Sequence, residues 1–149
     1  HAELISAGRK INDDMPHYVA NQIIKNINAV GKVLKESRVL VMGATFKENV
    51  SDIRNSKIFD VVSDLVSFGI EVTVIDPYAS AEEVLRHYNH PLSSEPTGTY
   101  DVIVLATKHD DYVKWTEADY RKWAREPFIF FDIKGVYKNN FKDCKYFSL

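Results

Sequence analysis

One aromatic residue and two lysines are the side chains in this sequence best suited to hold an anionic ligand. Phe46 and Lys47 stand together in a polar segment, and Lys134 stands in another polar segment nearer the end of the chain. An aromatic ring can stack on a base while an ammonium group binds a phosphate. The residue types leave a second interpretation open, in which Phe46 is partly buried and both lysines are solvated.

Four further polar residues follow Lys47 and favour local structure over chemistry. Asp52 and Arg54 are expected to form an ion pair that braces the loop rather than to transfer protons. Asn55 or Ser56 is expected to cap the helix that follows, since short polar side chains accept hydrogen bonds from the first free amides of a helix.

Asp76 and His109 each follow an apolar run, and each leaves two interpretations open. Asp76 ends the second of these runs, where sheets of this type often bind a ribose, but Asp76 followed by Pro77 is equally typical of a turn. His109 would suit a general base. The simpler interpretation of this segment is that it starts a helix at the adjacent Asp110.

Several common sites are not predicted. A dinucleotide site needs three glycines after the first strand, and this segment offers only Gly43, with Thr45 and Phe46 where open backbone is required. The histidines lack the spacing of metal ligands, so no metal site is predicted. Cys144 has no base partner in its Lys-Asp-Cys-Lys context. These residues therefore predict no dinucleotide cofactor site, no metal site and no nucleophilic cysteine.

The candidate residues follow short, nearly continuous apolar runs that alternate with segments of helical periodicity. Such runs are typical of strands buried on both faces of a parallel sheet. The alternation predicts an α/β fold, a Rossmann-like three-layer sandwich with a mainly parallel sheet. Helices are expected over residues 11–34, 55–68, 81–88 and 110–125, and strands over residues 37–42, 70–75, 101–107, 128–132 and 145–147.

The first helix is unusually long for a globular domain. Apolar residues recur at spacings of three and four from Ile11 to Leu34 and lie on one face. We expect residues 1–35 to form a linking or dimerisation helix and residues 36–149 to form the Rossmann-like domain. The alternative is a helix that only covers one face of the sheet.

The composition limits the function classes. The net charge of −2 favours neither nucleic acid nor an anionic membrane as a partner, and no apolar run reaches the roughly 20 residues that span a bilayer. A single cysteine and the lack of a signal-like segment are compatible with the cytoplasm. The sequence starts at His1 and enters a helical pattern at once, so we expect a fragment of a longer protein.

Several motifs resemble a known family. Residues 43–49 (GATFKEN) and 52–56 (DIRNS) resemble the motif that opens the C-terminal domain of the UDP-glucose/GDP-mannose 6-dehydrogenase family. Nearly the whole chain is similar in order and spacing, and the closest likeness is to the UDP-N-acetylhexosamine (GlcNAc, GalNAc or ManNAc) branch. The other segments that carry the resemblance are residues 8–16 (GRKINDDMP), 75–78 (IDPY), 106–109 (ATKH) and 131–135 (FDIKG).

The resemblance implies a substrate-binding domain of an enzyme that acts in surface polysaccharide biosynthesis. The family oxidises the C6 alcohol of a UDP-sugar to a carboxylate in two NAD-dependent steps, through a thiohemiacetal on a cysteine. By motif position, Phe46, Lys47 and Lys134 contact the UDP-sugar, while Asp52 and Arg54 brace the loop. NAD and the catalytic cysteine belong to an N-terminal domain that this chain lacks, so the fragment alone is expected to be inactive.

The resemblance also implies partners. The long helix would form the core of a homodimer, and the chain's own N-terminal domain would close over the UDP-sugar. A non-enzymatic dimerisation or nucleotide-binding module is the alternative, and a small stand-alone NAD-binding domain is a third option against which the missing glycines argue.

Overall fold

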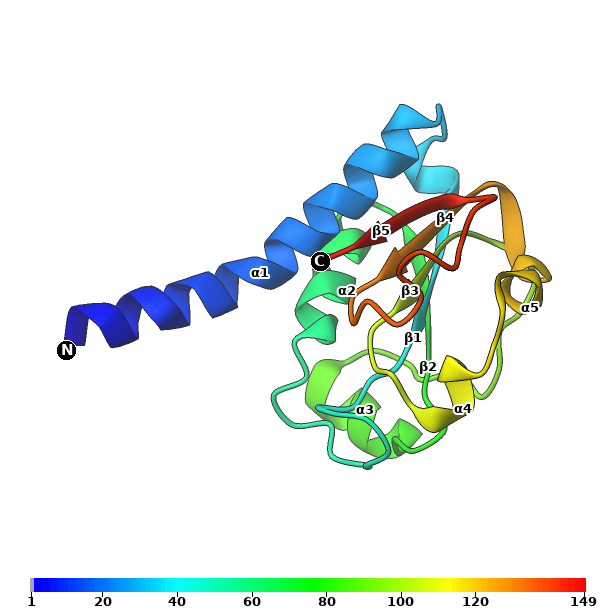
Figure 1. Ribbon diagram of the computed structural model, residues 1–149. Coiled ribbons are helices and arrows are strands. Elements are labelled where there is room, and N and C mark those ends of the chain that lie inside the picture. The colour runs from blue at the N-terminus through cyan, green and yellow to red at the C-terminus, as the bar shows by residue number, and fades with distance from the viewer. Residues whose placement is uncertain (1) are drawn as a thin grey trace.

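The computed structural model describes residues 2–149, with side chains from Asp14 onward. Five parallel strands form one sheet in the order β2-β1-β3-β4-β5 (Figure 1). Met42 pairs with both Ile75 and Leu105, and Leu105 pairs with Asp132, so the carboxyl ends of four strands lie along one edge. The strands are β1 (Arg38–Met42), β2 (Glu71–Ile75), β3 (Tyr100–Leu105), β4 (Ala124–Asp132) and β5 (Lys145–Ser148).

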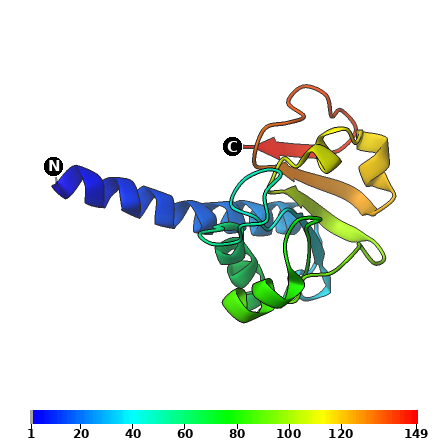
Figure 2. The ribbon, with the colours of Figure 1, turned by 90° about the horizontal axis from the view of Figure 1, so that it is seen from below.

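Helices and loops cover both faces of this sheet and complete the three layers (Figures 1 and 2). Val41 and Val104 belong to a core cluster shared with α1 and α2, whereas Leu40 and Phe130 face a cluster that includes tyrosines of α4 and α5. This alternation is the period of two of a strand. The predicted fold class is therefore confirmed. The helices are α1 (Ala2–Ala29), the 3-10 turn η1 (Leu34–Glu36), α2 (Ile58–Ser67), α3 (Ala81–Tyr88), α4 (Asp110–Val113) and α5 (Glu117–Arg121).

Helix α1 lies against the domain with only its second half. Val19, Ile23 and Ile27 are buried against α2 and the sheet. The first turns extend beyond the body of the domain (Figures 1 and 2), and Met15 and Tyr18 are 42% and 53% exposed. The prediction of one long helix is confirmed, although it begins before residue 11 and ends at Ala29. The predicted place of Ile11 on the apolar face lies outside the described side chains.

Two predicted helices differ from those observed. The segment 110–125 forms two short helices, because Thr116 and Asp119 build a reciprocal capping box that starts α5 anew. Helix α2 begins at Ile58 with Lys57 as its N-cap residue, so neither Asn55 nor Ser56 is the cap. Asn55 has a φ of 58°, a left-handed conformation that asparagine tolerates and that ends the loop with a sharp turn. None of the described helices is long and apolar enough to cross a membrane.

A buried carboxylate ties the opposite, amino edge of the sheet together. Asp101 accepts hydrogen bonds from Lys32 Nζ at 2.6 Å, from Arg125 Nη2 at 2.6 Å and from the Arg38 amide at 2.8 Å. Burial raises the pKa of this carboxyl, but these three donors outweigh it and lower the pKa of Asp101 to about 2. One side chain thus joins the segment after α1 to β1, β3 and β4.

Candidate functional site

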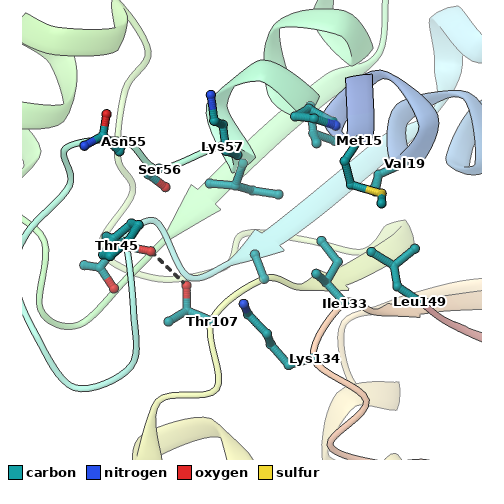
Figure 3. Close-up of a pocket in the computed structure, with 15 residues that line it drawn as sticks. Met15, Val19, Thr45, Asn55, Ser56, Lys57, Thr107, Ile133, Lys134 and Leu149 are labelled. Atoms are coloured by element: carbon teal, nitrogen blue, oxygen red, sulfur yellow. Dashed lines mark hydrogen bonds between the residues drawn. The ribbon is translucent and has the colours of Figure 1, made fainter. Parts of the chain in front are cut away.

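A cavity of about 490 Å³ opens at the carboxyl edge of the sheet (Figure 3). Strands β1 and β3 are neighbours there, but the chain leaves β1 toward β2 and leaves β3 toward β4. The cavity therefore lies at a topological switch point, where open α/β sheets bind their ligands. Its lining residues are Met15, Pro16, Val19, Thr45, Phe46, Asn55, Ser56, Lys57, Ile58, Val61, Ala106, Thr107, Ile133, Lys134 and Leu149.

Three loops and parts of the helices α1 and α2 build most of the walls. The loop after β1, residues 43–57, supplies Thr45 and Phe46, and the loop after β3 supplies Thr107, whose hydroxyl donates to the Thr45 carbonyl at 3.3 Å (Figure 3). The loop after β4 supplies Lys134, and α1 closes one side with Met15. The register of the parallel strands explains this convergence, since it brings their following loops to one edge.

Two of the three predicted ligand contacts meet at this cavity. Phe46 lines it and is 58% exposed. Lys134 is also exposed, and its ammonium end points toward the middle of the cavity, on the side of Thr107 (Figure 3). Lys47 is exposed but does not line the cavity. The contacts of all three residues with a ligand stay predictions.

Three lysines lie near Glu48, and one of them, Lys134, lines the cavity. The pKa of Glu48 is lowered, first by a backbone hydrogen bond and then by the charges of Lys108, Lys134 and Lys47. Three ammonium groups from three different loops are therefore close enough to act on one carboxylate. Lys108 is not among the predicted ligand contacts, although its place directly after the third predicted strand was a signal for this edge.

Asp52 and Arg54 form an ion pair within the loop after β1. The guanidinium reaches both carboxylate oxygens, at 3.0 and 3.1 Å, and this contact lowers the pKa of Asp52. The backbone carbonyl of Asp52 also accepts from the Phe46 amide at 2.8 Å. The geometry fits a bracing role for both residues, and that role stays a prediction.

Asp76 holds a turn rather than facing a ligand. Its Oδ1 accepts from the amides of Tyr78 and Ala79 at 2.7 and 3.1 Å, and its Oδ2 accepts from the Ala44 amide at 2.7 Å. Burial raises the pKa of Asp76, but its hydrogen bonds, that from His109 foremost, lower it below the usual value. The turn interpretation of Asp76 is therefore the one that the structure supports.

His109 is fully buried and is not part of the cavity wall. Its Nε2 lies 2.8 Å from Asp76 Oδ2 and 3.3 Å from Thr45 Oγ1, and its Nδ1 accepts from the Asn49 amide at 2.9 Å. A hydroxyl, an imidazole and a carboxylate in contact suggest a triad, but in a triad the acid and the hydroxyl bind opposite ring nitrogens. Both ring nitrogens are engaged within the protein, so the structure favours the simpler explanation, in which α4 begins at Asp110.

The loop after β1 does not fit the pyrophosphate of a dinucleotide. Gly43 has a φ of 106°, and a Cβ built on it would lie 2.5 Å from atoms of Thr107, so the glycine admits Thr107 rather than a ligand. The Ala44 amide, which a phosphate would need, is taken by the carboxylate of Asp76. NAD is therefore not expected to bind at this loop.

No other part of the described chain offers metal or thiol chemistry. No group of three histidine, cysteine, aspartate or glutamate side chains among the described residues is arranged to hold a metal ion. Burial and the charge of Glu117 raise the pKa of Cys144 to about 12, which keeps the thiol neutral at physiological pH. A second hollow of about 550 Å³, lined by Lys114, Trp115 and Trp123 among others, contains none of the predicted ligand contacts.

The strand order and the cavity at the switch point define the class, a Rossmann-like ligand-binding domain. Residues 40–139 match the family described as the UDP-glucose/GDP-mannose dehydrogenase family, UDP binding domain. The chain belongs to this family. The family that its motifs resemble is thereby confirmed.

Curated relatives agree with this assignment. The chain is 39% identical over 137 residues to the UDP-N-acetyl-D-glucosamine 6-dehydrogenase of Salmonella typhi, a match that covers 91% of this chain and 32% of the relative. It is 36% identical over 146 residues to the enzyme of the same name from Pseudomonas aeruginosa, covering 97% and 35% of the two chains. The chain thus spans about a third of the length of the curated relatives it matches.

Solved structures support the fold. The native structure of a UDP-N-acetyl-mannosamine dehydrogenase from Staphylococcus aureus matches with a TM-score of 0.79 and 27% identity, covering 99% of this chain and 33% of that one. An NDP-N-acetyl-D-galactosaminuronic acid dehydrogenase from Methanosarcina mazei matches with a TM-score of 0.84 at 23% identity, over 96% and 30% of the chains. The second likeness bears on the fold alone.

Proposed function

We propose that this chain is the C-terminal UDP-sugar-binding part of an NAD-dependent UDP-N-acetylhexosamine 6-dehydrogenase. The observation that carries the proposal is the switch-point cavity with Phe46 and Lys134 on its wall, within the stretch that matches the UDP-binding family. The exposed ring of Phe46 is suited to stack on the uracil. Lys134, with Lys47 and Lys108 nearby, supplies the positive charge that a diphosphate requires.

The oxidation itself belongs, in this proposal, to a separate N-terminal domain. NAD would accept the hydride from C6 of the sugar there, because the Gly43 loop does not fit a dinucleotide. The catalytic thiol would also come from that domain, since Cys144 is neutral and does not line the cavity. What this chain contributes is binding and orientation of the substrate, which a reaction between two bound reactants needs.

The wider setting follows from the same proposal. Residues 1–35 link the two domains and contribute to a homodimer, for which the projecting first turns of α1 and the exposed Met15 and Tyr18 are support. Residues 36–149 bind the UDP-sugar. The enzyme acts in the cytoplasm, and the uronic acid that it makes serves surface polysaccharide biosynthesis.

UDP titration tests the binding proposal. Lys134→Ala should weaken UDP binding about tenfold in calorimetry, because a charge-assisted contact contributes about 1.5 kcal/mol or more. Lys138→Ala removes another exposed lysine of the same loop and should leave the affinity unchanged. Equal affinity of both variants and the unmodified chain would remove Lys134 from the site.

A second candidate function rests on α1. The projecting helix favours a module whose role is dimerisation without ligand binding. Molar mass in solution, measured together with the UDP titration, separates the two functions. A dimer that does not bind UDP would support the module, and a chain that binds UDP in the low millimolar range or tighter would support the dehydrogenase domain.

A further inference from the structure

We propose that His109 is a positioning residue that fixes the loop after β1, and with it Phe46, in the conformation that binds the nucleotide. The proposal rests on the proposed function and adds a role that neither the cavity wall nor the family match assigns. It starts from a buried imidazole whose two ring nitrogens face two different loops.

The contacts fix the protonation of the ring. A backbone amide can only donate, so Nδ1 of His109 must be the acceptor of the Asn49 N–H, at 2.9 Å. The proton of the neutral ring therefore sits on Nε2 and is donated to Asp76 Oδ2, at 2.8 Å. Asp76 in turn accepts from the Ala44 amide, so the imidazole and the carboxylate form one connected unit.

This unit holds the loop on both sides of Phe46. Ala44 lies two residues before the ring and is bound by Asp76, while Asn49 lies three residues after it and is bound by His109. Asn49 also accepts from the Asp110 amide through its side chain, at 3.0 Å. These two anchors act together with the hydrogen bond from the Phe46 amide to the Asp52 carbonyl, at 2.8 Å, to fix the short segment that carries Phe46 and Lys47.

Phe46 depends on these anchors because its side chain is not held by burial. The residue is 58% exposed, so the backbone sets the position of its Cβ and thereby the region that the ring can reach. A loop that is already ordered before binding loses less conformational entropy when the ligand arrives. Loss of the anchors should therefore weaken nucleotide binding even though His109 does not line the cavity.

The competing explanation is that His109 only fills space. Its ring packs against Tyr78 and Tyr112, with centroids 4.7 and 5.7 Å away, and any buried residue contributes to stability. A residue that only fills space changes the melting temperature when replaced. A positioning residue also changes the order of the loop and the affinity at temperatures where the protein stays folded.

Two replacements separate the two hydrogen bonds. In His109→Asn the side-chain oxygen takes the place of Nδ1 and keeps the acceptor for Asn49. In His109→Gln the amide nitrogen reaches the place of Nε2 and keeps the donor to Asp76. His87→Gln, at an exposed histidine, is the matched control.

The readouts are amide hydrogen exchange by NMR and the Kd for UDP, both measured well below the melting temperature of each variant. His109→Gln should speed exchange of the Asn49 amide about tenfold or more relative to Val104 in the core, and should weaken UDP binding roughly five- to tenfold. His109→Asn should keep the Asn49 amide protected and retain more of the affinity. His87→Gln should change neither quantity.

Two results would overturn the proposal: an Asn49 amide that stays protected in His109→Gln, or faster exchange with wild-type affinity for UDP. The failure of the proposed function is distinguishable from both, since it would appear as an unmodified chain that does not bind UDP. In that case His109 positions no nucleotide-binding loop, and the proposal falls with the function on which it rests.

Discussion

Replacing Asp101 by asparagine should lower the free energy of unfolding by about 2.5 kcal/mol at pH 7. The side chain is 1% exposed, and its contacts lower the pKa from 3.8 to about 2. Each pKa unit corresponds to about 1.4 kcal/mol, which gives this magnitude. Because the pKa is lower in the folded chain, the contribution is complete above about pH 5 and is lost as the pH falls toward 2.

Urea denaturation at a series of pH values measures this effect. The difference between Asp101→Asn and the unmodified chain should shrink steadily below pH 4 and nearly vanish near pH 1.5, where both side chains are neutral. Asp143→Asn, at an exposed position, is the control and should change stability by less than about 0.5 kcal/mol at every pH. A difference that is absent at pH 7, or that does not depend on pH, would refute the role assigned to the buried carboxylate.

Two further predictions concern Gly43 and Cys144. Gly43→Ala should destabilise the chain by roughly 2 to 4 kcal/mol, because its Cβ would collide with Thr107. Gly31→Ala has open space around its Cβ and should cost only about 1 kcal/mol, for the positive φ of the backbone. Thermal or urea melts of both variants measure these losses of stability, and equal losses would contradict the prediction. Cys144 should react with a thiol reagent at pH 8 at least tenfold more slowly in the folded chain than in urea, because its pKa is raised to about 12 in the folded chain. Equal reaction rates would show that burial does not protect the thiol.

The strands could be predicted because their pattern is local. A run such as Val102 to Leu105 has no polar residue and is typical of a strand covered on both faces, and the structure buries all of it. The prediction of one helix over residues 110–125 was wrong because it also relied on a local pattern. Its apolar residues fit a helical period, but the capping box at Thr116 is a stronger local signal, and it divides the segment.

The cavity could be predicted only in part. The edge of the sheet follows from the strand order, so Phe46 and Lys134 could be placed near each other. The wall formed by Met15 of α1 could not, because it depends on how a distant helix packs. The contacts of His109 could not be predicted either, because its partners Asp76 and Asn49 are far from it in sequence. Only hydrogen bonds to such partners make a buried imidazole stable.

Mapping of UDP binding by NMR tests the central claim most directly. On addition of UDP, the amide signals of Phe46, Thr107 and Lys134, which line the cavity at the switch point, should shift most. The amides of Lys114 and Trp123, which line the second hollow, should stay where they are. Shifts confined to the second hollow, or no shifts at millimolar UDP, would contradict the assignment of this cavity as the UDP-sugar site.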